Sequence, residues 1–285
     1  MPDCAACPSK GTCHRPEKDS AKIHKSIRYV LAVVSGKGGV GKSSVCSLLA
    51  LQLARLGLRV GILDADLMGP SIPRLVGLEA ASVAADGAGH MLPVRSRSGI
   101  RIMSINVLLE DPAEPVVYRG PMLAQALKQM WDETAWGDLD VLLIDTPPGT
   151  GDIPLTLYQS FPIDAIVLVT TPQDLSALIV EKAKRLADKL GIDILGLVEN
   201  MSAFVCPTCG ARHALFGPED SGERSAARLG VPLLEKLPLD PGLNRLLDGG
   251  RLEETASEGL TRTAALIREK MGKLCGPEMR PTGKA

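Results

Sequence analysis

The sequence has few aromatic side chains and no excess of basic charge. Only 2 Trp, 3 Tyr and 3 Phe occur among its 285 residues, and 32 Lys and Arg are balanced by 33 Asp and Glu. Proteins that bind single-stranded nucleic acid combine a basic groove with aromatic rings on which the bases stack. The composition therefore argues against a nucleic-acid partner.

Long apolar runs are also lacking. Runs such as "VLAVV" and "VLLI" have the length of a strand, far below the ~20 residues that a transmembrane helix needs. The N-terminal stretch "MPDCAACPSKGTCHRPEKD" does not contain the apolar core of a secretion signal. We therefore expect a cytoplasmic protein without a membrane partner.

From Arg28 onward, short β-branched apolar runs alternate with longer helical stretches. The runs are "YVLAVVS", "RVGILD", "IRIMSI", "DVLLID", "AIVLVTT", "ILGLVEN" and "VPLLEKLP". Between them the sequence predicts helices over 43–57, 121–134, 174–190 and 219–229, and an irregular connection or hairpin over 79–99. Continuous apolar strands of this kind suit a parallel sheet that helices cover on both faces.

The predicted organisation is a single α/β domain over residues 28–272, with a doubly wound, mostly parallel sheet flanked by helices. Residues 1–27 are polar and contain three cysteines, and we expect them to form a flexible N-terminal arm. Residues 273–285 are rich in Gly, Pro and Lys and are expected to form a flexible tail.

A glycine-rich stretch between the first strand and the first helix predicts a phosphate site. The residues "GKGGVGKS", 36–43, fit the pattern G-x-x-x-x-G-K-[ST] in full. Glycines let backbone N–H groups point at phosphate oxygens, and the following helix adds its positive N-terminal end. Lys42 is expected to bridge the β- and γ-phosphates, and the Ser43 hydroxyl to ligate Mg²⁺. The residues expected to bind the nucleotide are Gly36, Lys37, Gly38, Gly39, Val40, Gly41, Lys42, Ser43 and Ser44.

Three aspartates follow predicted strands. Asp145 ends "DVLLID", and Asp64 and Asp66 lie in "ILDADLMGPS". In a parallel sheet the carboxyl ends of the strands converge on the ligand crevice. We therefore expect Asp64 and Asp145 to join Ser43 around Mg²⁺, and Asp66 to orient the attacking water. Helix capping explains one aspartate at such a position, but hardly three.

The phosphate loop contains a second lysine, Lys37, that a phosphate cradle does not need. With "ILDADLMGPS" and "LLIDTPPGTGD", the stretch "KGGVGK" closely resembles the deviant Walker A of the P-loop NTPase superclass of MinD, ParA and nitrogenase iron protein. The resemblance implies that Lys37 reaches the partner's nucleotide across a homodimer interface. A cation placed there stabilises charge in the transition state, so Lys37, Lys42 and Asp66 are the candidate catalytic residues.

The second informative stretch is "VENMSAFVCPTCG", which contains Cys206 and Cys209. A C-x-x-C turn presents two thiolates to one metal, too few for a tetrahedral site or for a four-cysteine cluster. Two chains related by a two-fold axis supply four. Zinc fits the same pattern, and Cys4 and Cys7 complete an intrachain zinc site if the arm folds back.

Five stretches together narrow the resemblance to the Mrp/ApbC family of ATP-binding iron–sulfur cluster carrier proteins, over roughly residues 23–270. They are "SGKGGVGKS", "DADLMGPSIPRLVG", "YRGPM", "LLIDTPPGTGD" and "VENMSAFVCPTCG". The resemblance implies an ATPase that holds a [4Fe–4S] cluster between Cys206 and Cys209 of two subunits. Such a carrier receives the cluster from a donor and passes it to recipient apoproteins. The resemblance also makes Asn200 a candidate contact for the nucleotide base.

The arm adds Cys4, Cys7 and Cys13 in "CAACPSKGTC". This spacing resembles the N-terminal cluster motif of the eukaryotic cytosolic scaffold relatives, which have a further cysteine upstream. Three cysteines are one ligand short of a four-cysteine cluster. A second cluster at the arm therefore requires His14, an exogenous ligand or cysteines of the second chain.

Two other functions fit the same superclass. A positioning ATPase of the MinD/ParA type requires a membrane-binding helix or a basic DNA-binding face, and the apolar stripe of residues 261–274 is more simply a core-packing one. That function leaves Cys206 and Cys209 unexplained. An electron-transfer reductase like nitrogenase iron protein uses single, widely separated cysteines, so the C-x-x-C pair argues against it.

Overall fold

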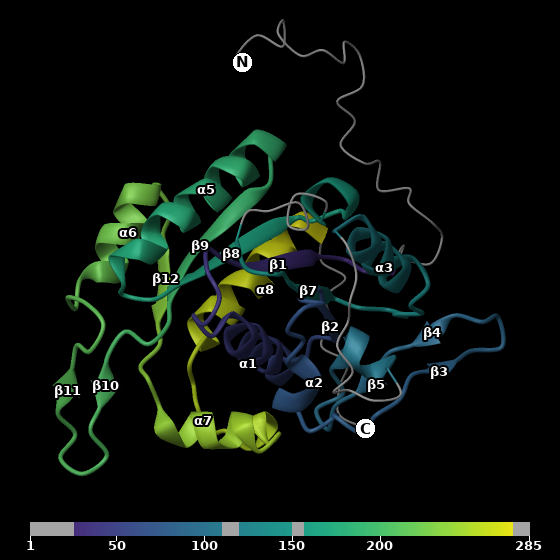
Figure 1. Ribbon diagram of the computed structural model, residues 1–285, viewed down its shortest axis with the longest axis horizontal. Coiled ribbons are helices and arrows are strands. Elements are labelled where there is room, and N and C mark those ends of the chain that lie inside the picture. The colour runs from purple at the N-terminus through teal and green to yellow at the C-terminus, as the bar shows by residue number, and fades with distance from the viewer. Residues whose placement is uncertain (1–25, 110–119, 150–156, 276–285) are drawn as a thin grey trace, which may run out of the picture.

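A central sheet runs through the molecule, with helices on both of its faces (Figure 1). The computed structural model describes residues 26–109, 120–149 and 157–275. Most of the predicted arm and tail lies outside these residues, including Cys4, Cys7 and Cys13, so the proposed boundaries of both segments stay predictions. In the part of the chain that is described, no helix is long and apolar enough to cross a lipid bilayer.

The described sheet has eight strands, and all of its strand pairs are parallel except β5 with β6. In spatial order the strands are β12 (Leu233–Lys236), β9 (Asp193–Glu199), β8 (Ala165–Thr170), β1 (Val30–Ser35), β7 (Val141–Asp145), β2 (Val60–Asp64), β6 (Arg101–Met103) and β5 (Val94–Arg95). The mostly parallel α/β sheet expected from the alternating apolar runs is confirmed.

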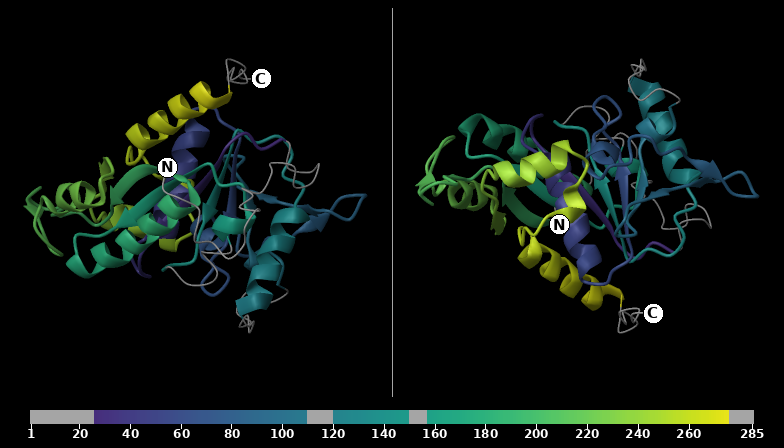
Figure 2. Two further views of the ribbon diagram at one scale, coloured as in Figure 1. Left: turned by 90° about the horizontal axis from the view of Figure 1, so that it is seen from above. Right: turned by 90° about the horizontal axis from the view of Figure 1, so that it is seen from below.

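Alternation along the buried strands gives the sheet two apolar cores. In β1, Leu31 and Val33 pack on one face, while Ala32 and Val34 pack on the other. The first face is covered by α1 (Lys42–Arg55), α7 (Pro241–Asp248) and α8 (Thr261–Cys275). The second is covered by α3 (Gly120–Asp132), α5 (Asp174–Leu190) and α6 (Ser221–Leu229). Figure 2 shows α1 and α8 on one side of the sheet and α3 and α5 on the other.

Shorter elements connect these layers. They are α2 (Ile72–Leu75), the 3₁₀ turns η2 (Ile105–Val107) and η3 (Leu252–Glu254), and two small hairpins, β3 (Ala84–Ala85) with β4 (Met91–Leu92) and β10 (Phe204–Val205) with β11 (Arg212–His213). The β3–β4 hairpin lies within the irregular connection expected over 79–99. In Figure 1 the β10–β11 hairpin projects beyond the sheet.

The four helices predicted between strands are confirmed as α1, α3, α5 and α6, with ends that differ by up to two residues. Helix α7 was not predicted. In α8 the side chains of Ala264, Ile267 and Met271 are fully buried, so the apolar stripe of this helix packs in the core. The carboxyl ends of β1, β7 and β2 lie next to one another in the sheet, which brings the predicted phosphate loop and aspartates to one edge.

Candidate functional site

The phosphate loop, residues 36–41, connects β1 to α1 and follows a backbone path that requires glycine. Gly39 and Gly41 both have φ of 78°, a left-handed conformation that other residues rarely adopt. A Cβ atom on Gly41 would overlap the side-chain nitrogen of Asn200. Because Gly38, Gly39 and Gly41 have no side chains, a phosphate group can approach the backbone N–H groups of the loop at the N-terminus of α1.

Three predicted site residues meet directly after this loop. Lys42 Nζ lies 2.6 Å from Asp145 Oδ1, and Ser43 Oγ donates a hydrogen bond of 2.6 Å to Asp145 Oδ2. Asp145 is fully buried and Lys42 is 6% exposed. Together they offer a cation for phosphate and a hydroxyl and carboxylate for Mg²⁺, the donor set that both ligands require.

A second buried carboxylate lies beside this triad. Asp64 ends β2 in register with Asp145 at the end of β7. Its side chain accepts hydrogen bonds from the Ser104 hydroxyl at 3.1 Å and from the backbone N–H of Ser71 at 3.2 Å. Burial, reinforced by the charge of Asp145, raises the pKa of Asp64 to about 7. Two carboxylates held this close in the interior favour a divalent cation between them.

The remaining acidic residue, Asp66, lies two residues beyond the end of β2 and is only partly buried. Its backbone N–H donates to Asp64 Oδ1 at 3.3 Å. Burial raises the pKa of Asp145, and the negative charge of Asp66 raises it further. The charge of Lys42 and the hydrogen bonds from Lys42 and Ser43 lower it in part. Asp66 therefore lies near Asp145, and its role in orienting water stays a prediction.

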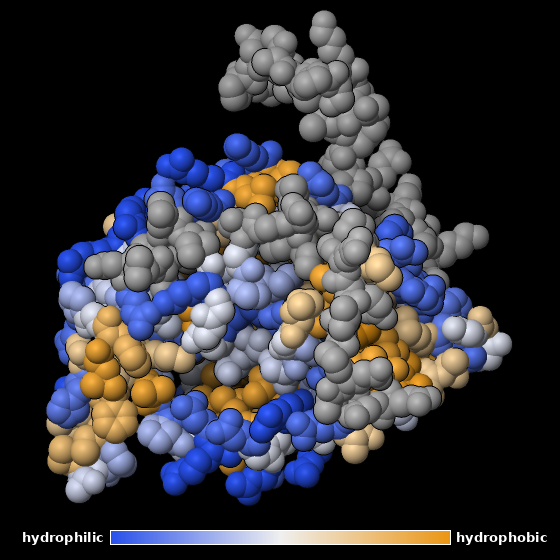
Figure 3. All heavy atoms as spheres, in the orientation of Figure 1, coloured by the Kyte–Doolittle hydropathy of each residue, from blue (hydrophilic) through white to orange (hydrophobic). Residues whose placement is uncertain are grey.

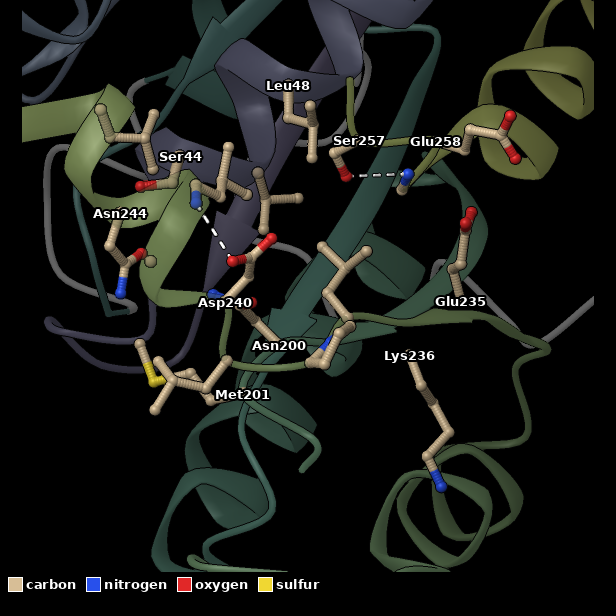
Figure 4. Close-up of a pocket in the computed structure, with 18 residues that line it drawn as sticks. Ser44, Leu48, Asn200, Met201, Glu235, Lys236, Asp240, Asn244, Ser257 and Glu258 are labelled. Atoms are coloured by element: carbon tan, nitrogen blue, oxygen red, sulfur yellow. Dashed lines mark hydrogen bonds between the residues drawn. The ribbon is translucent and has the colours of Figure 1, made fainter. Parts of the chain in front are cut away.

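A cavity of about 300 Å³ opens next to the first turn of α1 (Figure 4). Its lining comes from four segments of the chain: Gly41, Ser44, Val45 and Leu48; Asn200 and Met201; 235–240 with Leu243, Asn244 and Leu247; and Ser257, Glu258 and Gly259. Its size is at the lower end of small-ligand pockets. Since Gly41 and Ser44 belong to both the phosphate site and the cavity wall, a nucleotide held at Lys42 has room here for its nucleoside.

Asn200 links the cavity to the phosphate loop. Its side-chain N–H donates a hydrogen bond of 2.9 Å to the carbonyl oxygen of Val40. With one N–H engaged, the second N–H and the amide oxygen of Asn200 remain available to a base. The resemblance pointed to Asn200, whose contact with a base stays a prediction. The sequence analysis did not identify the lining residues Pro238, Leu239 and Asp240, although "PLDPG" after the last strand is a turn signal.

Lys37 makes its contact away from the triad. Its ammonium group donates to Gln173 Oε1, just before α5 in the same chain. Neither the sequence patterns nor the resemblance indicated Gln173. The role of Lys37 toward a partner's nucleotide stays a prediction.

Cys206 and Cys209 lie in the tight turn of the β10–β11 hairpin. The N–H of Cys206 donates to Ala211 O at 2.9 Å, and the N–H of Gly210 donates to Cys206 O at 2.8 Å. Backbone N–H groups of Cys209 and Thr208 hydrogen-bond to the Cys206 sulfur and lower the pKa of its thiol, which favours the thiolate that binds metals. The Cys209 side chain is exposed.

The surface around this turn is apolar. Leu215 and Phe216 are 55% and 39% exposed, and Figure 3 shows apolar side chains gathered over the projecting hairpin. Among the described residues, no three His, Cys, Asp or Glu side chains come together to hold a metal. Within that part of the chain, Cys206 and Cys209 therefore have no third side chain of these types beside them, and their role as metal ligands stays a prediction. Cys46, in α1, is buried.

Comparisons with known proteins agree with this geometry. A family model described as ParA, NUBPL iron-transfer P-loop NTPase, matches residues 26–271. The chain belongs to this family. An iron–sulfur cluster carrier protein of Clostridium perfringens is 43% identical over 274 residues, which cover 90% of this chain and 96% of that protein.

Solved structures extend the comparison of this P-loop NTPase. A nucleotide-binding protein from Archaeoglobus fulgidus, solved in complex with ADP, is 45% identical with a TM-score of 0.72, covering 81% of this chain and 90% of that one. The septum site-determining protein MinD from Pyrococcus horikoshii, complexed with Mg-ADP, is 21% identical with a TM-score of 0.61, covering 87% and 99%. At that identity the likeness to MinD shows the fold alone. The predicted fold class and family are confirmed.

Proposed function

We propose that this protein is an ATPase that carries an iron–sulfur cluster and transfers it to recipient apoproteins. The observation that carries the proposal is that one domain brings Lys42, Ser43 and Asp145 into contact after a phosphate-loop sequence and also presents a pair of thiols at Cys206 and Cys209. The names of the relatives support the same function.

The hydrolytic half follows from the roles of the site residues. Lys42 neutralises charge on the β- and γ-phosphates, while Ser43, Asp64 and Asp145 hold Mg²⁺ directly or through water. Asp66 orients a water molecule that attacks the γ-phosphorus. The bond from that phosphorus to the bridging oxygen breaks, and ADP and inorganic phosphate leave. Adenosine occupies the cavity beside Asn200, whose amide oxygen suits the amino group of adenine.

The carrier half requires more ligands than one chain presents in the described residues. Cys206 and Cys209 of two subunits give the four thiolates of a [4Fe–4S] cluster, and the exposed apolar surface around the hairpin suits burial between subunits. In the same homodimer, Lys37 leaves Gln173 and acts on the partner's nucleotide. The arm cysteines Cys4, Cys7 and Cys13 are candidates for a second cluster.

Anaerobic reconstitution with iron and sulfide, followed by absorption spectroscopy and metal analysis, tests the proposal. The intact protein is compared with a Cys206→Ser/Cys209→Ser variant and with a variant that lacks residues 1–20. We expect a brown, oxygen-labile species that the double variant loses while it keeps its ATPase activity. Loss of part of the signal on deleting the arm assigns a second cluster to the arm. Colourless protein with stoichiometric zinc overturns the carrier function and leaves the ATPase.

A further inference from the structure

The two cysteines lie on a long excursion of the chain whose two ends are joined. We call residues 200–220, between β9 and α6, the cysteine excursion; it contains the β10–β11 hairpin. Glu199 immediately precedes it and Ser221 follows it. The Ser221 hydroxyl donates a hydrogen bond of 2.6 Å to Glu199 Oε1, and both side chains are buried. The excursion is therefore clamped at its base, and its position depends on what its two arms contact.

The incoming arm is hydrogen-bonded to the segment that follows β12. The N–H and hydroxyl of Ser202 both donate to Leu237 O, at 2.9 and 3.0 Å, and the N–H of Leu239 donates to Ala203 O at 2.8 Å. Phe204 then forms a parallel bridge with Leu239. Because Phe204 is the first residue of β10, this ladder runs directly into the hairpin that holds Cys206.

Both sides of the same ladder border the nucleotide cavity. Leu237, Pro238 and Leu239 are among its lining residues. So are Asn200 and Met201, the first residues of the excursion, which are labelled in Figure 4. A group that enters the cavity therefore contacts the ladder itself, with no intervening element between it and the hairpin.

The outgoing arm, the C-terminal half of the excursion, packs against the segment Pro172–Gln173, which contacts Lys37. Gly217 packs so tightly against the carbonyl oxygen of Pro172 that a Cβ at Gly217 would overlap it. Pro172 is buried and precedes Gln173, which accepts the hydrogen bond from Lys37. Both arms of the excursion therefore touch segments that contact the nucleotide site.

From these contacts we infer that the Ser202–Phe204 ladder and the Gly217–Pro172 contact are positioning elements for the cysteines, so that nucleotide in the cavity changes the placement of Cys206 and Cys209. The inference rests on the proposed function for its purpose, which is to make cluster binding depend on nucleotide. Its physical content concerns the cluster-free chain: the two thiols differ in exposure between the nucleotide-bound and nucleotide-free protein.

Alkylation of the thiols in cluster-free protein tests this directly. The rate for Cys206 and Cys209 is measured by peptide-resolved mass spectrometry, under reducing conditions with a chelator, without nucleotide, with ADP and with a non-hydrolysable ATP analogue and Mg²⁺. Buried Cys46 is the internal reference. We expect saturating nucleotide to change the Cys209 rate about fivefold, the lower end of typical coupling between linked sites.

Variants of the two contacts provide the second readout. Gly217→Ala pushes the outgoing arm off Pro172, and Ser202→Ala removes one hydrogen bond of the ladder; neither residue lines the cavity. Each is expected to reduce the nucleotide response of Cys209 to less than about twofold, with ADP affinity retained. Gly87→Ala, where an added Cβ meets nothing within 4 Å, is the matched control and should keep the full response.

The inference is overturned if the wild-type rates do not change although calorimetry shows that nucleotide binds, or if both variants keep the wild-type response. These outcomes are separate from those of the reconstitution experiment. If the protein binds an iron–sulfur cluster but nucleotide does not change the alkylation rates of the thiols, this inference is wrong and the carrier function stands. If the protein binds zinc and nucleotide changes the alkylation rates of the thiols, the carrier function is wrong and this inference stands.

Discussion

The buried carboxylates Asp64 and Asp145 dominate the electrostatics of the nucleotide site. Both are fully buried at neighbouring strand ends, and Lys42 forms its ion pair with Asp145. One lysine does not balance two carboxylates, and the remaining negative charge suits a divalent cation. The carboxylate of Asp64 is instead stabilised by hydrogen bonds from the hydroxyl of Ser104 and from the backbone N–H groups of Ser71 and Ile72.

This imbalance predicts how stability depends on pH. The pKa of Asp64 rises from 3.8 to about 7 on folding, so the folded state binds its proton more tightly than the unfolded state. In metal-free protein, the free energy of unfolding should therefore decrease as pH rises through that interval. Asp64→Asn should show a smaller decrease between about pH 5 and about pH 8, measured by urea unfolding with a chelator present.

The control for that measurement is Asp248→Asn, which changes an exposed aspartate at the end of α7. It should keep the wild-type dependence on pH. The assignment to Asp64 fails if Asp64→Asn and the wild-type protein lose stability equally over the same interval.

At the level of elements, the apolar runs of the sequence correctly predicted the central strands of the sheet. The runs that became β1, β2 and β7 have no polar side chain before their last residues because the sheet is covered on both faces. The ends of β2 and β7 correctly located Asp64 and Asp145, and the phosphate-loop pattern located Lys42 at the start of α1.

Helix α7 escaped prediction because it is only eight residues long and begins with Pro241 after the Asp240 cap. The cavity was not predicted because it forms where four segments of the chain come together, and no local sequence pattern indicates such a tertiary contact. The contacts of Lys37 with Gln173 and of Glu199 with Ser221 depend on tertiary structure in the same way.

The phosphate loop allows a sharp test of one local requirement. Gly41→Ala combines an unfavourable φ of 78° with an overlap against Asn200. We expect it to weaken ADP binding at least about tenfold, or about 1.4 kcal/mol, in isothermal titration calorimetry. Gly89→Ala has a φ of 86° but nothing within 4 Å of the added Cβ, so it should cost about 1 kcal/mol of stability and leave ADP affinity unchanged. Equal ADP affinities in the two variants would contradict this account.

The whole molecule depends on one sheet that contributes to both cores. Along β7, Leu143 packs on the face of α1 and α8, while Leu142 and Ile144 pack on the face of α3 and α5. Loss of packing on either face therefore affects the strand that ends in Asp145.

For this reason Leu143→Ala should lower the free energy of unfolding by about 2–5 kcal/mol, as expected for a buried leucine, in urea titrations followed by circular dichroism. Leu92→Ala, at a leucine that is 39% exposed in the β3–β4 hairpin, should stay within about 0.5 kcal/mol of wild type. A loss for Leu143→Ala no larger than that for Leu92→Ala would show that β7 is not central to the fold.

The contact of Asp145 with both Lys42 and Ser43 has a consequence for which ligands bind together. A phosphate group binds the same ammonium group of Lys42 that faces Asp145, and a metal ion binds the same Ser43 oxygen whose hydroxyl hydrogen Asp145 accepts. Phosphate alone adds negative charge beside the buried Asp145, whereas a metal ion alone adds positive charge beside Lys42. These two changes of charge compensate each other, so we expect the site to bind the magnesium complex of a nucleotide more tightly than either component alone.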